Sequence, residues 1–252
     1  YDKDKRAGRI LAIPHYQVDD GINADEVQNV RAFGQESAVQ TIQEMVNMRM
    51  GQHVQLKLDP TLEYQRIGAI TGIILNGDAS TLYNLFTEFN VSAQSEVDFN
   101  LDASAPATGA VRTKCTGVVR SIAKALGGAP YSGVYGFCSD AFWDALIANV
   151  EVRESYLAQQ EASQLRAGVA YETLRFGGIT FENYRGGTGT EEATAFIATD
   201  KAYFFPVGVP GFFRTVYAPA DYVETVNTIG LPRYAKQYPR QDGKGIIMQA
   251  QM

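Results

Sequence analysis

Residues 23–60 read NADEVQNVRAFGQESAVQTIQEMVNMRMGQHVQLKLDP, and this pattern predicts one unusually long helix. Asn23 suits the N-cap, and Glu26 follows three residues later, where a capping box places a carboxylate. Apolar residues then recur at spacings of three or four along one helical face: Val39, Ile42, Val46, Met50 and Val54. A helix over residues 24–57, ended by Asp59-Pro60, would be about 50 Å long at ~1.5 Å per residue.

A helix of this length cannot be wrapped by a domain of this size, so we expect it to run along a sheet or against neighbouring chains. Gly34 and Gly51 each weaken it by up to ~1 kcal/mol relative to alanine, which favours a bend or a break at either position. Met45, Met48 and Met50 crowd one part of it, and their flexible side chains suit an adaptable contact surface. The alternative is that these methionines face the chain's own core.

The segment before the helix predicts an extended arm. Residues 6–16 alternate poorly and contain Pro14, which lacks the amide donor that a central strand needs. Nothing within so short a segment can bury its apolar side chains together, so we expect them to contact another surface. The predicted interaction residues on the arm and the helix are Ile10, Ile13, Met45, Met48 and Met50.

Shorter elements are predicted after residue 60. Asn76-Gly77 between two apolar runs predicts a β-hairpin, and Ser139 suits a helix N-cap. We predict helices over 111–126, 139–147 and 151–164, and strands over 97–101, 134–138, 193–198, 202–207 and 247–252, with two more strands joined at 177–178. This succession indicates α/β layer packing in a second lobe, inserted between the early and late parts of the first.

Composition limits the class of protein. The chain has 252 residues, of which 45% are hydrophobic and 20% charged, with a net charge of −6 at pH 7. This composition is globular, and its acidic balance argues against an electrostatic clamp on nucleic acid. No apolar run approaches the ~20 residues that span a bilayer, and the first residues lack a secretory signal, so we expect no membrane partner. Because residue 1 is not Met, we expect a fragment or a processed form.

Candidate residues for catalysis or metal binding are few. Cys115, Cys138, His15 and His53 lie far apart in sequence and form no metal-ligand spacing. A cysteine–histidine pair would need the fold to bring them together, and buried free thiols are the simpler interpretation. The loop 186–190, GGTGT, lacks the following lysine of a phosphate loop, and the next two residues are glutamates, which would repel phosphate. We therefore expect no catalytic residue, no cofactor and no metal.

Several segments, taken in order, resemble the major capsid protein E family of tailed bacteriophages, the lambda-like head proteins. They cover most of the chain, and their order and spacing carry the resemblance more than any single one does. The segments are Ile13-Pro14-His15, Asp25 to Gly34, Leu62 to Ala69 with Gly72, Leu75 to Ser80, Phe176 to Phe181, Ala202 to Pro206 and Gly245 to Gln249.

The resemblance implies an α+β chain with the tailed-phage, Hong Kong-type capsid fold. Residues 1–18 would be the remnant of an extended loop, because family members look longer at the N-terminus. Residues 19–101 would form a peripheral lobe with the spine helix (24–57) and the hairpin, and residues 102–211 an axial lobe. Residues 212–252 would return to the peripheral lobe.

The resemblance also implies a structural function. We expect a major head protein that self-assembles into the icosahedral shell of a tailed phage or prophage around double-stranded DNA, held as contents without specific binding. The full-length protein would form hexamers and pentamers, with decoration, scaffold and portal proteins as further partners. Its location would be the virion, and the bacterial host cytoplasm during assembly. The alternatives are an encapsulin-like compartment shell and a soluble two-lobed enzyme that uses a cysteine–histidine pair.

Overall fold

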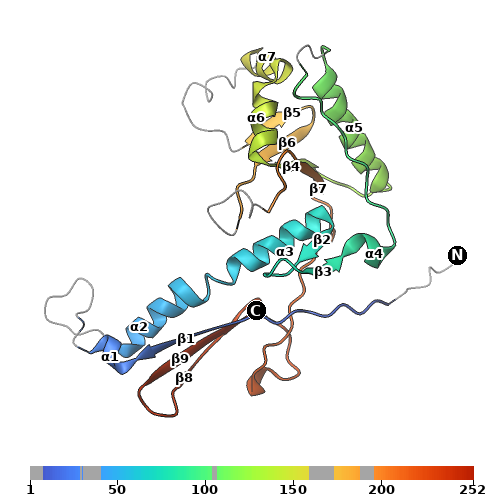
Figure 1. Ribbon diagram of the computed structural model, residues 1–252. Coiled ribbons are helices and arrows are strands. Elements are labelled where there is room, and N and C mark those ends of the chain that lie inside the picture. The colour runs from blue at the N-terminus through green and yellow to red at the C-terminus, as the bar shows by residue number, and fades with distance from the viewer. Residues whose placement is uncertain (1–7, 29, 31–40, 104–106, 159–172, 188–195) are drawn as a thin grey trace. The chain divides into compact units, whose positions relative to one another are not determined.

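The computed structural model describes residues 8–28, 30, 41–103, 107–158, 173–187 and 196–252, and it contains both helices and sheets (Figure 1). The chain divides into two compact units. The first unit comprises Tyr1–Leu62 and Arg214–Met252, and the second comprises Glu63–Phe213. The predicted α+β class is confirmed.

A three-stranded antiparallel sheet forms the centre of the first unit. β1 (Gln17–Asn23) pairs with β9 (Gly245–Gln251), and β9 pairs with β8 (Tyr234–Pro239). The first and last described parts of the chain thus lie side by side, in blue and dark red in Figure 1. The strand predicted over residues 247–252 is confirmed as β9.

Helices pack on this sheet through the apolar stripe of residues 42–54. α1 (Ala24–Val27) follows β1, and α2 (Ile42–Arg49) continues into a π-helical turn (Met50–Val54). Val46 is buried with Ile22 of β1 and Met248 of β9, and Val54 is buried with Ala250 of β9. The stripe therefore faces the unit's own sheet.

The structure contradicts the first part of the single helix predicted over residues 24–57. The expected capping box is present, since the Asn23 amide donates to Glu26 Oε1 at 3.2 Å. However, α1 ends after four residues, because Gln28 is extended at φ −61° and ψ 121°. Residues 31–40, which include Gly34 and Val39, lie outside the described residues.

The predicted end of that helix is also wrong. The expected break at Gly51 appears as the π-helical turn, and Asp59-Pro60 opens α3 (Asp59–Thr71) instead of closing the preceding helix. Proline is tolerated in the first turn, because the amide that it lacks has no partner within the helix there. The Asp-Pro pair is thus a start signal in this chain.

A mixed four-stranded sheet organises the second unit. Its strand order is β5-β6-β4-β7, with β4 and β6 parallel and the other pairs antiparallel. Helices α5, α6 and α7 pack on the face that carries Val134, Gly136 and Cys138. The elements are α5 (Ala110–Ala125), β4 (Gly133–Cys138), α6 (Asp140–Ala148), α7 (Val150–Ala158), β5 (Thr173–Phe176), β6 (Ile179–Asn183) and β7 (Ala202–Val207).

A glycine pair closes the turn between β5 and β6. Gly177 and Gly178 have φ values of 59° and 87°, a left-handed conformation that other residues adopt only at a cost. A Cβ on Gly177 would also lie 2.5 Å from the Cβ of Cys115. The turn therefore needs glycine both for its backbone conformation and for its packing against α5.

The opposite face of this sheet packs against α3. Ile67 is buried with Phe196 and Ile197, and Phe137 of β4 packs against this cluster. The Tyr184 hydroxyl donates to Glu63 Oε1 at 2.5 Å. These contacts place the unit boundary between residues 62 and 63, whereas the sequence predicted a lobe boundary between residues 101 and 102.

The predicted Asn-Gly hairpin is confirmed, and two predicted strands are not. β2 (Ile73–Leu75) pairs with β3 (Thr81–Asn84), and α4 (Leu85–Phe89) follows. Residues 97–101 form no strand. Phe99 is buried in the core and Leu101 is half-buried against it, while Val97, Asp98 and Asn100 are exposed. In the predicted strand 193–198, residues 193–195 lie outside the described residues, and residues 196–198 form no strand.

Candidate interaction surface

Large apolar side chains are exposed on the arm before β1. Ile10 is 101% exposed, and Leu11 and Ile13 are each 45% exposed. Residues 8–16 form no helix or strand. The two arm residues predicted as interaction residues, Ile10 and Ile13, are thus accessible, and their contact with a partner stays a prediction.

The three methionines of the helix differ in their environment. Met45 and Met50 are half-buried and pack against the core beside Val46. Met48 is 43% exposed. The alternative that the methionines face the chain's own core therefore applies to Met45 and Met50, and Met48 remains as a predicted contact residue.

Further exposed apolar side chains lie in residues 214–233 of the first unit, the segment that precedes β8 in the sequence, which we call the tail loop. It contains one 3₁₀ turn, Val223–Thr225. Val223 is 90% exposed and Ile229 is 89% exposed. The exposed apolar residues of the tail loop are Val216, Val223, Val226, Ile229 and Leu231.

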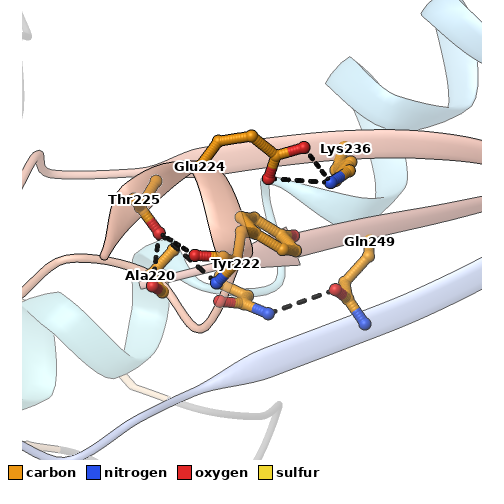
Figure 2. Close-up of polar contacts among 7 residues, drawn as sticks. Ala220, Tyr222, Glu224, Thr225, Lys236 and Gln249 are labelled. Atoms are coloured by element: carbon orange, nitrogen blue, oxygen red, sulfur yellow. Dashed lines mark hydrogen bonds and ion pairs between the residues drawn. The ribbon is translucent and has the colours of Figure 1, made fainter.

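Hydrogen bonds within the tail loop hold its backbone in place. Thr225 Oγ1 lies 2.5 Å from the Ala220 carbonyl oxygen and 2.9 Å from that of Tyr222, and it accepts from the Tyr222 amide at 3.3 Å (Figure 2). The Tyr234 hydroxyl accepts from the Leu231 amide at 2.8 Å. The loop thus satisfies much of its own polar backbone while its apolar side chains stay exposed.

Polar contacts also fasten the tail loop to the sheet. Gln251 of β9 is 2% exposed, and its Oε1 accepts from the Asp221 amide at 2.9 Å. Lys236 of β8 donates to both carboxylate oxygens of Glu224, at 2.7 and 2.9 Å, and its ammonium lies 5.0 Å from the Tyr222 ring centre (Figure 2). The tail loop is therefore attached to strands β8 and β9 by defined polar contacts.

The charges at this attachment shift the titration of their neighbours. The hydrogen bonds from Lys236 lower the pKa of the Glu224 carboxyl, which keeps the ion pair charged at neutral pH. Burial, followed by the negative charge of Asp19, raises the pKa of the Tyr222 phenol. Tyr222 therefore stays neutral beneath the Lys236 ammonium.

Sequence reasoning missed the exposed aliphatic residues of the tail loop. Val223, Val226 and Ile229 recur every third position, in a stretch where Pro219 and Gly230 disfavour a long helix. Apolar residues in a segment that forms no regular amphipathic element have no core side to face. Regularly spaced aliphatic residues between a proline and a glycine are thus the sequence signal that could have predicted this exposed surface.

The cysteines offer no reactive thiol. Burial raises the pKa of the Cys115 thiol and of the Cys138 thiol to about 12 each, so both are protonated and shielded at neutral pH. The second unit contains a cavity of about 790 Å³, and neither cysteine nor histidine lines it. The described residues hold no cluster of three or more potential metal ligands.

Known phage proteins are similar to this chain along most of its length. The chain matches the family described as phage major capsid protein E over residues 1–252. Two relatives are each named major capsid protein. The one from Pseudomonas phage KPP10 is 28% identical, over 97% of this chain and 72% of its own length. The one from Salmonella phage Felix O1 is 23% identical, over 92% of this chain and 70% of its own length.

A solved chain from Mycobacterium phage Che8 is also similar, with a TM-score of 0.44 and 11% identity, over 94% of this chain and 64% of its own length. Among the described residues, no helix is long and apolar enough to cross a membrane. The family match spans every residue of the sequence, and it confirms the resemblance found from the sequence segments. The chain therefore belongs to the phage major capsid protein E family.

Proposed function

We propose that this chain self-assembles into the icosahedral shell of a tailed phage or prophage head that encloses double-stranded DNA. The observation that supports this most directly is the tail loop, which exposes aliphatic side chains from a backbone held by hydrogen bonds. Contiguous exposed apolar patches are typical of surfaces that another protein covers, and these five side chains fall between Val216 and Leu231 of one segment. The family provides the partner, since a shell protein contacts copies of itself.

The magnitudes favour an assembly that repeats weak contacts. Fully burying a valine or isoleucine side chain stabilises by about 1.5–3 kcal/mol. The five exposed aliphatic residues of the tail loop could therefore contribute roughly 7–15 kcal/mol, similar to the ~4–15 kcal/mol lost in rigid-body freedom on association. One such contact is weak, but a closed shell repeats it by symmetry.

The finer parts of the proposal concern partners and location. We expect hexamers and pentamers in the shell, with portal, scaffold and decoration proteins as further contacts. The protein would be made in the bacterial host cytoplasm and end in the virion. An encapsulin-like shell is the alternative, and genes for a terminase, a portal and a head protease beside this one would favour the phage head.

Electron microscopy of the full-length protein tests the proposal. Expression of the complete gene should yield shells, tubes or capsomers. A protein that stays monomeric under all conditions of salt and concentration would contradict it. For the enzyme alternative, replacing both cysteines by serine should abolish a turnover, and the raised thiol pKa values argue against such a turnover.

A further inference from the structure

Helix α5 carries an unusual charge for an acidic chain. Its sixteen residues include four basic side chains and no acidic one, although the whole chain has a net charge of −6. The basic residues are Arg112, Lys114, Arg120 and Lys124. Net charge therefore hides a local concentration of positive charge in the second unit.

Three of the four basic residues share one arc of the helix. Val111, Cys115 and Val118 are buried against the sheet. At about 100° per residue, Arg120 and Lys124 fall on the side opposite these buried residues, and Lys114 falls on a flank beside Val118. All three are exposed. The other exposed residues in the arc from Arg120 to Lys114 are small, namely Thr113, Gly117 and Ser121. We call these six residues the α5 basic face.

The fourth basic residue, Arg112, contacts other side chains of the second unit. Arg112 donates to Ser155 Oγ at 3.4 Å, and its guanidinium lies 5.5 Å from the Phe176 ring centre. Lys114, Arg120 and Lys124 form no salt bridge with the part of the chain that the structure describes. Their charges are thus not neutralised by a described partner.

Acidic groups lie next to the α5 basic face at two places. The Glu151 carboxylate accepts from the Val111 and Arg112 amides at 3.0 and 3.2 Å, at the helix N-terminus. Segment 94–102, which carries Glu96, Asp98 and Asp102, lines the same cavity as Ser121, and Glu96 is paired with Lys201 at 2.6 Å. The acids near α5 therefore mark one edge and one end of the face.

The composition of the face favours phosphate over protein as its partner. Protein interfaces have an apolar core and are depleted of lysine, whereas this face has three cations, two hydroxyls and a glycine, with no apolar side chain beyond a threonine methyl. Lysine, arginine, serine and threonine are the side chains that commonly contact phosphate oxygens. Small residues between the cations allow a nucleic-acid backbone to approach closely.

We propose that the α5 basic face binds the phosphate backbone of double-stranded DNA without reading its sequence. The inference rests on the proposed function, because a shell around DNA supplies the ligand at high local concentration. Each chain offers about three phosphate contacts, which is weak binding alone. Many copies facing one DNA molecule would add their contacts.

Salt dependence measures the number of contacts. The association constant for duplex DNA falls with salt with a log–log slope of about −0.9 per phosphate contact, hence about −2.7 for three contacts. Between roughly 50 and 200 mM salt, the affinity of the unchanged chain for a short fluorescent duplex should fall about 40-fold. The duplex affinity of the double variant K114Q/K124Q, which keeps one of the three contacts, should fall only about 3.5-fold over the same range.

The matched control is K57Q/K244Q, which removes the same two charges from exposed lysines of the first unit. It should keep the slope of the unchanged chain, and both variants should keep its urea midpoint. A K114Q/K124Q slope equal to that of the control would overturn the inference. So would a K114Q/K124Q variant that loses self-association but keeps duplex binding, because the face would then contact a second copy.

The two proposals fail in different ways. Shells seen by electron microscopy together with no salt-dependent duplex binding would refute the α5 inference alone. Duplex binding by a protein that never assembles would refute the proposed shell function instead.

Discussion

The double substitution V223S/I229S in the tail loop should impair assembly while leaving the fold intact. Both side chains are about nine-tenths exposed, at 90% and 89%, so little packing is lost when they shrink. The loop's hydrogen bonds through Thr225 and Gln251 involve neither side chain. The free energy of unfolding should therefore change by less than ~0.5 kcal/mol.

The effect on assembly follows from the apolar surface that a neighbouring copy would cover. At about 1.5–3 kcal/mol for each buried side chain, the pair contributes roughly 3–6 kcal/mol per subunit. Because ~1.4 kcal/mol corresponds to a factor of ten, the critical concentration for assembly should rise about a hundredfold to ten-thousandfold.

Sedimentation over a range of protein concentrations measures that critical concentration, and urea unfolding monitored by circular dichroism measures stability. The matched control is V91S/V97S, which shortens two aliphatic residues that are 57% and 50% exposed in the second unit. An unchanged critical concentration in V223S/I229S, or an equal rise in the control, would refute the assignment of the tail loop as an assembly surface.

Four further outcomes follow from the packing and charges of the described residues. Met50→Asp should unfold the first unit, visible by circular dichroism, because Met50 packs on two buried clusters. Gly177→Ala should lower the urea midpoint by the equivalent of about 1–3 kcal/mol, since it combines a positive φ with a clash against Cys115. The Glu224 pKa is lowered in the folded chain, so its ion pair stabilises above the ordinary carboxyl pKa, and this stability is lost as pH falls through the folded pKa. Lys236→Gln should flatten that acid dependence in unfolding curves. Finally, the two buried thiols should react with a thiol reagent only after urea unfolding, and rapid labelling of the folded chain would contradict their burial.

Local chemistry explains which elements could be predicted. The Asn76-Gly77 hairpin, helix α5 and the Ser139 cap are each specified by residues close in sequence, and the structure confirms them. The exposure of Ile10 and Ile13 also follows from a short segment with no room for a core. Such features depend on turn chemistry and periodicity, which a single sequence displays directly.

Other predictions failed where tertiary contacts decide the secondary structure of a segment. The alternation of residues 97–101 suggested a strand, but Phe99 is anchored by Phe142 and Phe204, at ring-centre distances of 5.6 Å each, and no strand pairs with the segment. Asp59-Pro60 is compatible with either the end or the start of a helix. Only the packing of Ile67 and its neighbours shows that α3 begins there.

The sequence by itself determined the family, the α+β class and most local elements, because these depend on residue order, periodicity and turn chemistry. Tertiary structure alone decided that the stripe of residues 42–54 faces the unit's own sheet, and that the aliphatic residues of the tail loop do not. The physical reason is that burial depends on which distant segments meet. β9 covers Val46 and Val54, whereas no described segment covers Val223 or Ile229.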